Sequence, residues 1–106
     1  MPRIVQRETA RRDLIEHFVY LAENASQQVA DRFLTQAEAT FADLAREPLI
    51  GAPLHLGHAD LADLRKWRIK GFDNHLVFYE PRRDGVSIVR VLHAASDWWS
   101  LLGLTG

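Results

Sequence analysis

The sequence predicts an α+β fold in which one strand and two helices precede three consecutive antiparallel strands (β-α-α-β-β-β). Two observations lead to this prediction. Apolar residues recur at helical spacing between residues 10 and 47, whereas residues 64–93 form three β-type runs separated by turn-forming residues. Consecutive strands joined by tight turns pair as hairpins, so the last three are expected to form a three-stranded antiparallel sheet. A length of 106 residues fits a single domain over residues 1–106.

The N-terminal half is predicted to hold a short strand and an antiparallel helix hairpin. Residues 3–7 suit an edge strand, and Thr9 has the side chain of a helix N-cap. A first helix is expected over residues 10–23. A second, capped by Ser26, should continue to residue 47, because the residue before Pro48 is pushed out of the helical region. The inward-facing apolar positions are expected to be Leu14, Phe18, Leu21 and Ala22, then Val29, Phe33, Ala37, Phe41 and Leu44.

Residues 48–63 are predicted to form a long loop, because they contain two glycines and two prolines and show no clear period. Within it, His55, His58 and Asp60 resemble a set of metal ligands. Two histidines on an irregular loop have no fixed geometry, however, and structural metals are usually held by tighter ligand sets. We therefore expect no metal site and no cofactor.

The C-terminal part is predicted to form the three strands and a short helix. Residues 64–70 alternate between apolar and cationic side chains, and residues 75–80 are apolar on both faces, as in a central strand. An Asp84-Gly85 turn leads into a third strand over residues 86–93, which is rich in β-branched side chains. Ser96 or Asp97 is a suitable N-cap for a last helix.

Composition excludes several functional classes. The chain has no cysteine, so disulfides, thiolate nucleophiles and thiolate zinc sites are excluded. No apolar run approaches the ~20 residues that span a bilayer, and the N-terminus lacks the apolar stretch of a signal peptide. We expect a cytoplasmic protein without a membrane partner.

The formal charge is distributed unevenly along the chain. Residues 1–63 carry six arginines and ten acidic residues, a charge of −4, whereas residues 64–106 carry seven Lys or Arg and four acidic residues, a charge of +3. The whole chain has a net charge of −1, so it does not have the basic excess of a general polyanion binder. An anionic partner would have to be bound locally, on the sheet.

Lys66, Arg68 and Lys70 are two residues apart on a predicted strand and therefore project from one face. Together with Arg65 and Arg90 they predict a cationic surface for phosphate or for an acidic protein tail. The alternative is a solvated face whose lysines protect an edge strand from aggregation. We favour binding, because three alternating cations on one strand face are more than solubility requires and Arg90 adds a fourth on another strand.

His93 ends the third strand, and His75 and Tyr79 are expected to share a strand face. A histidine near Arg and Tyr could serve as general acid or base in RNA cleavage, with arginine stabilising the phosphate charge of the transition state. The simpler interpretation, which we favour, is that His93 hydrogen-bonds to backbone at the strand end.

Trp98 and Trp99 are adjacent and cannot both point inward from a helix or a strand. An exposed aromatic side chain often marks a protein interface. A terminal helix that folds back on the core would instead cover both in part. We favour the interface.

The element order, the length and several segments resemble the RelE/ParE toxin superfamily, the toxin halves of bacterial type II toxin–antitoxin modules. The segments are residues 64–69, 75–79 and 88–93, together with a Pro-x-x-Gly-x-Pro pattern at residues 48–53 after the second helix. Arg90-Val91-Leu92-His93, followed by Asp97, resembles the ParE branch in particular.

The resemblance implies one of two activities. RelE-like members cleave mRNA in the ribosomal A site with Lys, Arg, His, Glu or Tyr residues on the sheet. ParE-like members lack that set and poison DNA gyrase. In both branches an antitoxin neutralises the toxin by wrapping a C-terminal segment around it. The isoelectric point near 6.5 is low for docking into ribosomal RNA, and Ala94, Ala95 and Ser96 stand where a nuclease-type C-terminus has further Arg or Tyr.

We therefore predict a ParE-like, non-enzymatic gyrase inhibitor of the kind that serves plasmid stabilisation. Its cognate antitoxin, expected to be of the ribbon-helix-helix type, should cover the helix hairpin and the sheet edge. The predicted residues for binding the target or the antitoxin are Arg65, Lys66, Arg68, Arg90, His93, Trp98 and Trp99.

Two other hypotheses stay open. One is a ribosome-dependent mRNA endonuclease, for which the candidate catalytic residues are His93, Arg90, Arg68 and Tyr79. The other is an inactive toxin homologue that serves only as an antitoxin-bound repressor partner.

Overall fold

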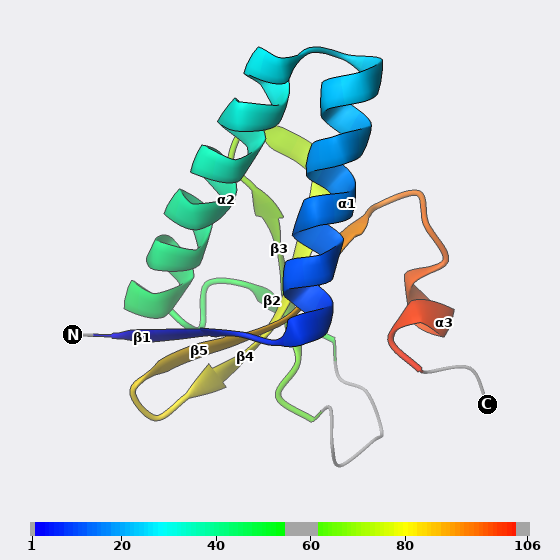
Figure 1. Ribbon diagram of the computed structural model, residues 1–106. Helices are drawn as coiled ribbons and strands as arrows, with labels where there is room; N and C mark the ends of the chain where they lie inside the picture. The colour runs from blue at the N-terminus through cyan, green and yellow to red at the C-terminus, as the bar shows by residue number, and fades with distance from the viewer. Residues whose placement is uncertain (1, 55–61, 104–106) are drawn as a thin grey trace.

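Two long helices cover one face of a five-stranded sheet in the computed structural model, which describes residues 2–54 and 62–103 (Figure 1). The elements in chain order are β1 (Arg3–Gln6), α1 (Glu8–Asn24), α2 (Gln27–Arg46), β2 (Ala52–Pro53), β3 (Arg65–Ile69), β4 (Phe72–Arg82), β5 (Gly85–His93) and α3 (Trp98–Leu101). The α+β class, the helix hairpin and the short C-terminal helix are as predicted.

The sheet is larger than the three-stranded antiparallel sheet that the sequence predicts, and that prediction was wrong. Its strand order is β1-β5-β4-β3-β2. Strands β3, β4 and β5 pair antiparallel as expected, but β1 adds in parallel to β5 and β2 adds antiparallel to β3. A two-residue strand such as β2 has no periodicity to detect, and the partner of β1 lies at the other end of the chain. The sheet is therefore mixed.

The helix boundaries follow from local chemistry, with one exception. Ser26 caps α2 as predicted, because its Oγ accepts a hydrogen bond from Val29 N at 3.1 Å. The helix ends at Arg46, before Glu47 and the following proline. The N-cap prediction for Thr9 was wrong, since α1 begins at Glu8 and the Thr9 hydroxyl donates to Val89 O of β5 at 3.2 Å. This side chain ties the helix to the sheet instead of capping it.

The main core lies between the helices and the sheet. From α2, Phe33, Ala37, Phe41 and Leu44 are essentially inaccessible, as the helical period predicts, and Val29 is only partly buried. From α1, Leu14 is buried, whereas the other predicted inward positions, Phe18, Leu21 and Ala22, are partly buried. The sheet contributes Ile69, Val77, Tyr79, Val86, Ile88 and Val91.

A β-bulge in β5 decides which side chains reach each face. Phe78 pairs with Arg90 but Tyr79 pairs with Ile88, so Val89 is an extra residue in β5. As a result Ile88 and Val91 both belong to the helix-covered core, while Val89 and Leu92 join a second cluster with Phe78 and Leu64. Trp98 and Leu102 pack on this second cluster, so α3 partly covers the other sheet face.

Candidate functional site

Arg90 is bound to α1 and is not displayed beside the cations of β3. Its Nε donates to Asp13 Oδ2 at 2.7 Å and its Nη2 to Asp13 Oδ1 at 2.9 Å, while Nη1 donates to Leu101 O at 2.9 Å. Asp13 Oδ2 also accepts from Val91 N at 3.0 Å. The hydrogen bonds with Asp13 raise the pKa of the Arg90 guanidinium above its ordinary value. Arg90 thus links α1, β5 and α3.

Asp13 was missed by the sequence analysis. Its side chain is only 7% exposed, which is unusual for a carboxylate unless it is paired. The available signal was an acidic residue next to Leu14 on the inner side of a predicted helix. An inward carboxylate of this kind requires a buried cation, and Arg90 on the facing strand supplies it.

Tyr79 holds the segment that follows α2. Its side chain is fully buried, and its hydroxyl donates to Pro48 O and accepts from Gly51 N, both at 2.8 Å. Burial raises the pKa of this hydroxyl, with smaller opposing effects from the Gly51 hydrogen bond and the Arg65 charge. Arg65 holds the same segment, since its Nη1 donates to Gly51 O at 2.7 Å and to Leu49 O at 3.2 Å. These contacts fix the backbone of the Pro-x-x-Gly-x-Pro segment. A Cβ at Gly51 would lie 2.5 Å from the Tyr79 hydroxyl oxygen, which accounts for the glycine of the pattern.

Two of the predicted cations do share a strand face. Lys66 and Arg68 alternate with Trp67 and Ile69, which pack toward the helix-covered core, so both cations lie on the opposite face of the sheet. Lys66 Nζ lies 5.6 Å from the centroid of the Trp98 ring, and Arg68 Nε lies 3.8 Å from Asp73 Oδ1. Lys70 follows the end of β3 and is exposed.

The two C-terminal tryptophans have different environments. Trp98 packs against Phe78, with ring centroids 5.4 Å apart, whereas Trp99 stacks on Trp98 at 4.2 Å and is 46% exposed. Of the two predicted N-caps, Ser96 and Asp97, it is Asp97 that caps α3, accepting from Ser100 N at 3.4 Å and from Ser100 Oγ at 2.6 Å. Lys66, Arg68, Trp98 and Trp99 form what we call the β3–α3 surface.

His93 lies in a histidine cluster at the end of the sheet, beneath α1. It pairs with His75 across β4 and β5, with ring centroids 5.2 Å apart, and His75 lies 4.9 Å from His17 of α1. His93 Nδ1 accepts a hydrogen bond from Ala95 N at 3.0 Å, which agrees with the simpler interpretation of this residue. His17, which the sequence analysis did not single out, bonds through Nε2 to Val91 O at 2.8 Å.

The histidine cluster borders a cavity of about 510 Å³ that is also lined by Glu16, Tyr20 and Leu21. Burial, and then the charges of His17 and His93, lower the pKa of His75 to about 4. His75 Nδ1 is buried and has no hydrogen-bond partner in the described part of the chain.

The four acid–base candidates do not converge on one site. Arg68 lies on the sheet face away from the helices, and His93 lies on the face beneath α1. Tyr79 is buried with its hydroxyl fully engaged, and Arg90 is committed to Asp13. Of the four candidates, only His93 lines the cavity beside the histidine cluster, and its titratable neighbours there are Glu16, His17, Tyr20 and His75. Among the described residues, no arginine lines it.

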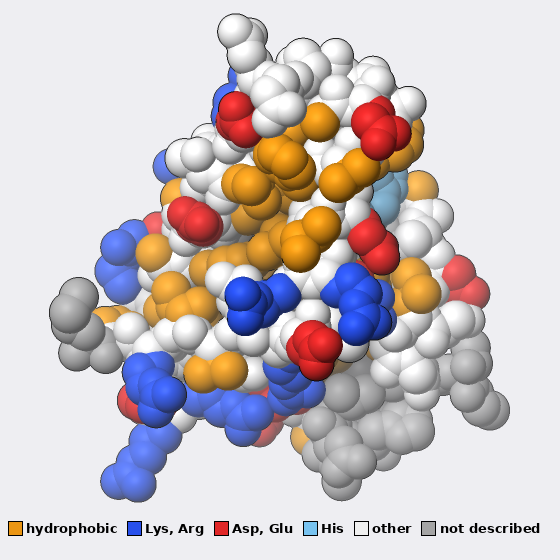
Figure 2. Space-filling view, in the orientation of Figure 1, with side chains coloured by type: hydrophobic (Ala, Val, Ile, Leu, Met, Phe, Trp, Pro, Cys, Tyr) orange, Lys and Arg blue, Asp and Glu red, His pale blue; other side chains and the backbone are white. Residues whose placement is uncertain are grey.

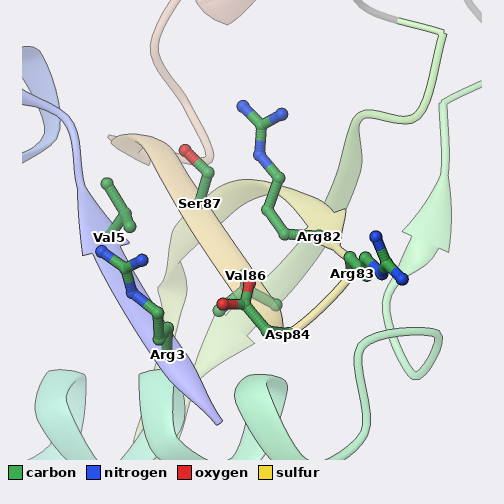
Figure 3. A pocket seen from close by; sticks show the side chains of 7 residues that line it. All are labelled: Arg3, Val5, Arg82, Arg83, Asp84, Val86 and Ser87. Carbon is green, nitrogen blue, oxygen red and sulfur yellow. The ribbon is translucent and has the colours of Figure 1, made fainter.

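A second group of arginines lies at the end of the sheet formed by β1 and the β4–β5 hairpin, where the sequence did not indicate a site. Arg3 of β1, Arg82 at the end of β4 and Arg83 of the β4–β5 turn line a pocket of about 470 Å³ with Val5, Asp84, Val86 and Ser87. Figure 3 shows Arg3 and Arg82 on either side of β5, which carries Ser87. We call this the hairpin pocket. No sequence signal joined its members, because only the parallel pairing of β1 with β5 brings Arg3 to the hairpin.

An apolar groove runs along the helix hairpin. It has a volume of about 250 Å³ and is lined by Leu14, Ile15, Phe18 and Leu34 with Gln6 and Arg11. Ile15 is 63% exposed and the neighbouring Val19 is 44% exposed. Figure 2 shows a patch of hydrophobic side chains over the region between α1 and α2, and Lys and Arg side chains toward the lower left, near the end of the chain where β1 lies in Figure 1. We call this feature the helix groove.

The described residues contain no group of three or more His, Asp or Glu side chains arranged to hold a metal ion. The loop residues His55, His58 and Asp60 lie outside the part of the chain that the structure describes. None of the described helices is both long and apolar enough to cross a membrane.

Comparison with known proteins places this geometry in context. The family model described as the ParE toxin of the type II toxin–antitoxin system parDE matches residues 4–98. A solved structure described as the chromosomal ParDE TA system from P. aeruginosa superposes with a TM-score of 0.69 at 12% sequence identity, covering 88% of this chain and 96% of that chain. At this identity the superposition shows a shared fold. No curated protein matches the sequence.

Proposed function

Since this chain belongs to the ParE toxin family of type II toxin–antitoxin systems, we propose that it is a toxin that inhibits DNA gyrase by binding. In this proposal the chain traps gyrase on cleaved DNA without catalysing a reaction itself. A cognate antitoxin neutralises it.

The dispersal of the acid–base candidates is the observation that carries this proposal. General acid–base catalysis requires the proton-transferring group within hydrogen-bond reach of the reacting atoms, and a phosphate needs a free cation beside it. Tyr79 and Arg90 are both engaged in internal hydrogen bonds, and Arg68 lies on the other sheet face from His93. Binding a target protein makes no such demand.

The β3–α3 surface is the part of the molecule best suited to contact gyrase. Trp99 is 46% exposed and stacks on Trp98, while Lys66 and Arg68 lie on the neighbouring strand. An exposed aromatic beside cations has the composition of a protein interface hot spot. Arg65 and Arg90 are removed from the proposed contact set, because backbone carbonyls and Asp13 already occupy their guanidinium groups.

The helix groove is proposed as the site for the antitoxin. Its apolar side chains are the exposed Ile15 and the partly buried Phe18 on α1 and the partly buried Leu34 on α2, and they match the apolar stripe of an amphipathic segment. The P. aeruginosa neighbour is described as a ParDE toxin–antitoxin system, which fits this assignment. A ribbon-helix-helix type for the antitoxin remains part of the proposal.

A two-part assay tests the proposal. The purified chain is incubated with gyrase, ATP and supercoiled plasmid, and linear DNA is quantified after detergent and protease treatment. In parallel, the chain is induced in cells and ribosome-bound mRNA is mapped for cleavage. We expect gyrase-dependent DNA breaks, intact mRNA, and strongly reduced breaks with Trp99→Ala or Lys66→Gln/Arg68→Gln. Arg12→Gln on α1 serves as the control with normal inhibition.

Two outcomes would contradict the proposal. Codon-linked mRNA cleavage that is lost in His93→Ala would establish the endonuclease instead. Folded protein that causes neither DNA breaks nor growth arrest would favour the inactive homologue.

A further inference from the structure

Four arginines and two carboxylates meet at the end of the sheet formed by β1 and the β4–β5 hairpin. The arginines are Arg3, Arg7, Arg82 and Arg83, and the carboxylates are Glu80 and Asp84. This leaves two positive charges in excess, on a chain whose net charge is −1. Among the described residues, neither Arg3 nor Arg83 has a carboxylate within ion-pair distance.

Glu80 positions two of these arginines without neutralising both. Its Oε2 lies 3.4 Å from Arg7 Nη2 and 3.4 Å from Arg82 Nη2, and its side chain is only 12% exposed. Arg7 Nε also donates to Ser87 Oγ at 3.3 Å, which adds a second restraint on that side chain. One carboxylate balances one guanidinium, and the Arg82 side chain is 50% exposed, so donors of Arg82 remain available to an anion.

The composition of the hairpin pocket distinguishes it from a protein-binding groove. Among the residues that line it, only Val5 and Val86 have apolar side chains, and Val86 is 1% exposed. Protein interfaces have an apolar, aromatic-rich centre, whereas nucleic-acid interfaces are polar and strongly positive. The helix groove of this molecule has the first character and the hairpin pocket has the second.

We propose that the hairpin pocket binds neighbouring phosphate groups of a nucleic-acid backbone through Arg3, Arg82 and Arg83. The planar guanidinium group offers paired donors that match phosphate oxygens. Phosphate contacts carry no sequence information, so binding is independent of base sequence. The pocket binds nucleic acid in the absence of gyrase, so this inference goes beyond the proposed function.

Direct binding to DNA tests this inference. The full chain is titrated against a fluorescent duplex of about 20 base pairs, and anisotropy is followed between about 50 and 200 mM salt. We expect salt-dependent binding that weakens roughly tenfold or more at low salt in R3Q/R82Q/R83Q. The slope of log affinity against log salt should fall by roughly 2 to 3, about 0.9 for each phosphate contact removed.

Two matched variants separate binding from folding. R3Q/R83Q leaves the ion pairs of Glu80 intact and should melt at the wild-type temperature. Its slope of log affinity against log salt should fall by roughly 2, as expected for the loss of two phosphate contacts. R11Q/R12Q/R32Q removes three exposed arginines from α1 and α2 and should bind DNA almost as tightly as the wild type. Gyrase inhibition is measured on the same preparations. A loss of DNA binding with normal gyrase inhibition, or the reverse, therefore shows which of the two proposals has failed.

Three results would overturn the inference. The first is wild-type protein that shows no DNA binding at about 50 mM salt. The second is an equal loss of binding in the R11Q/R12Q/R32Q control. The third is binding of a glutamate-rich peptide to the pocket without competition from the duplex. That result would show that the pocket binds an acidic protein segment instead of nucleic acid.

Discussion

At the scale of single residues, several side chains that could have served a partner are engaged within the fold. Arg90 and Asp13 are the clearest pair, since three guanidinium nitrogens and both carboxylate oxygens have partners. Arg65 and Tyr79 are similarly committed to backbone groups near Gly51. Residue type alone did not reveal these internal partners, because the sequence does not show whether an arginine on a strand is paired within the fold or exposed to solvent.

Arg90→Gln should lower the free energy of unfolding by about 3 kcal/mol, because it leaves the Asp13 carboxylate buried without its cation. Urea denaturation measures this change. Arg12→Gln, which breaks an exposed pair with Glu8, should change it by less than about 0.5 kcal/mol. If Arg90→Gln melted like the wild type and lost only partner binding, Arg90 would be a contact residue after all.

His75 should make stability depend on pH. Burial lowers the pKa of His75 from its ordinary value of 6.5 to about 4 in the folded chain. Between pH 6.5 and 4 the unfolded chain therefore binds a proton that folded His75 does not. The resulting stabilisation is complete above pH 6.5 and is lost progressively as the pH falls toward 4. Melting temperatures from pH 7.5 to 4.5 should therefore fall more steeply for wild type than for His75→Phe. Parallel curves for the two proteins would refute the assignment.

At the scale of elements, the main determinants are contacts between segments that are distant in the sequence. Tyr79 of β4 supports the segment after α2, and Thr9 of α1 bonds to β5. The bulge at Val89 pairs Arg90 with Phe78, from where its guanidinium reaches both Asp13 of α1 and Leu101 of α3, and it places His93 beneath α1. Strict alternation along β5 would have placed these side chains differently.

Tyr79→Phe should cost about 1 to 3 kcal/mol, because Gly51 N–H and Pro48 C=O would both lose their buried partner. Tyr20→Phe is the matched control, because Tyr20 lies on α1 and is 63% exposed. Loss of its hydroxyl should change the free energy of unfolding by less than about 0.5 kcal/mol. Chemical denaturation of both variants provides the comparison. Equal effects would show that the Tyr79 hydroxyl does not hold the loop.

Alanine substitutions of the two adjacent tryptophans of α3 should have different effects, one on stability and the other on gyrase inhibition. Trp98→Ala removes packing on Phe78 and should destabilise the fold by about 2 to 4 kcal/mol. Trp99→Ala removes an exposed ring and should cost about 1 kcal/mol or less, yet reduce gyrase-dependent DNA cleavage at least tenfold. Normal inhibition by Trp99→Ala would exclude this ring from the contact with gyrase.

At the scale of the whole molecule, three surfaces of different chemistry lie on different parts of one sheet-and-helix framework. The helix groove is apolar, the β3–α3 surface combines aromatic rings with cations, and the hairpin pocket is rich in arginine. Such separation permits distinct partners to be bound without competition for the same residues.

Ile15→Glu in the helix groove should abolish neutralisation by the antitoxin while leaving gyrase inhibition intact. Ile15 is 63% exposed, so the variant should fold normally, but a carboxylate in the groove opposes an apolar partner. Co-expression with the cognate antitoxin, scored by colony survival, measures neutralisation. Glu23→Gln on the same helix is the control. Simultaneous loss of both activities would mean that the surfaces overlap.

The sequence by itself determined the order of the elements other than β2, the helix hairpin, the antiparallel pairing of β3, β4 and β5, the cap at Ser26, and the cap of α3 to within Ser96 or Asp97. These depend on local periodicity and on side chains within three residues of their partners. Only the tertiary structure decided that the sheet has five strands, that Arg90 pairs with Asp13, and that Arg3 meets Arg82 and Arg83. Each of these depends on contacts between segments that are separated in the sequence: β1 with β5, β2 with β3, or α1 with β5. Pairing of this kind leaves no local pattern.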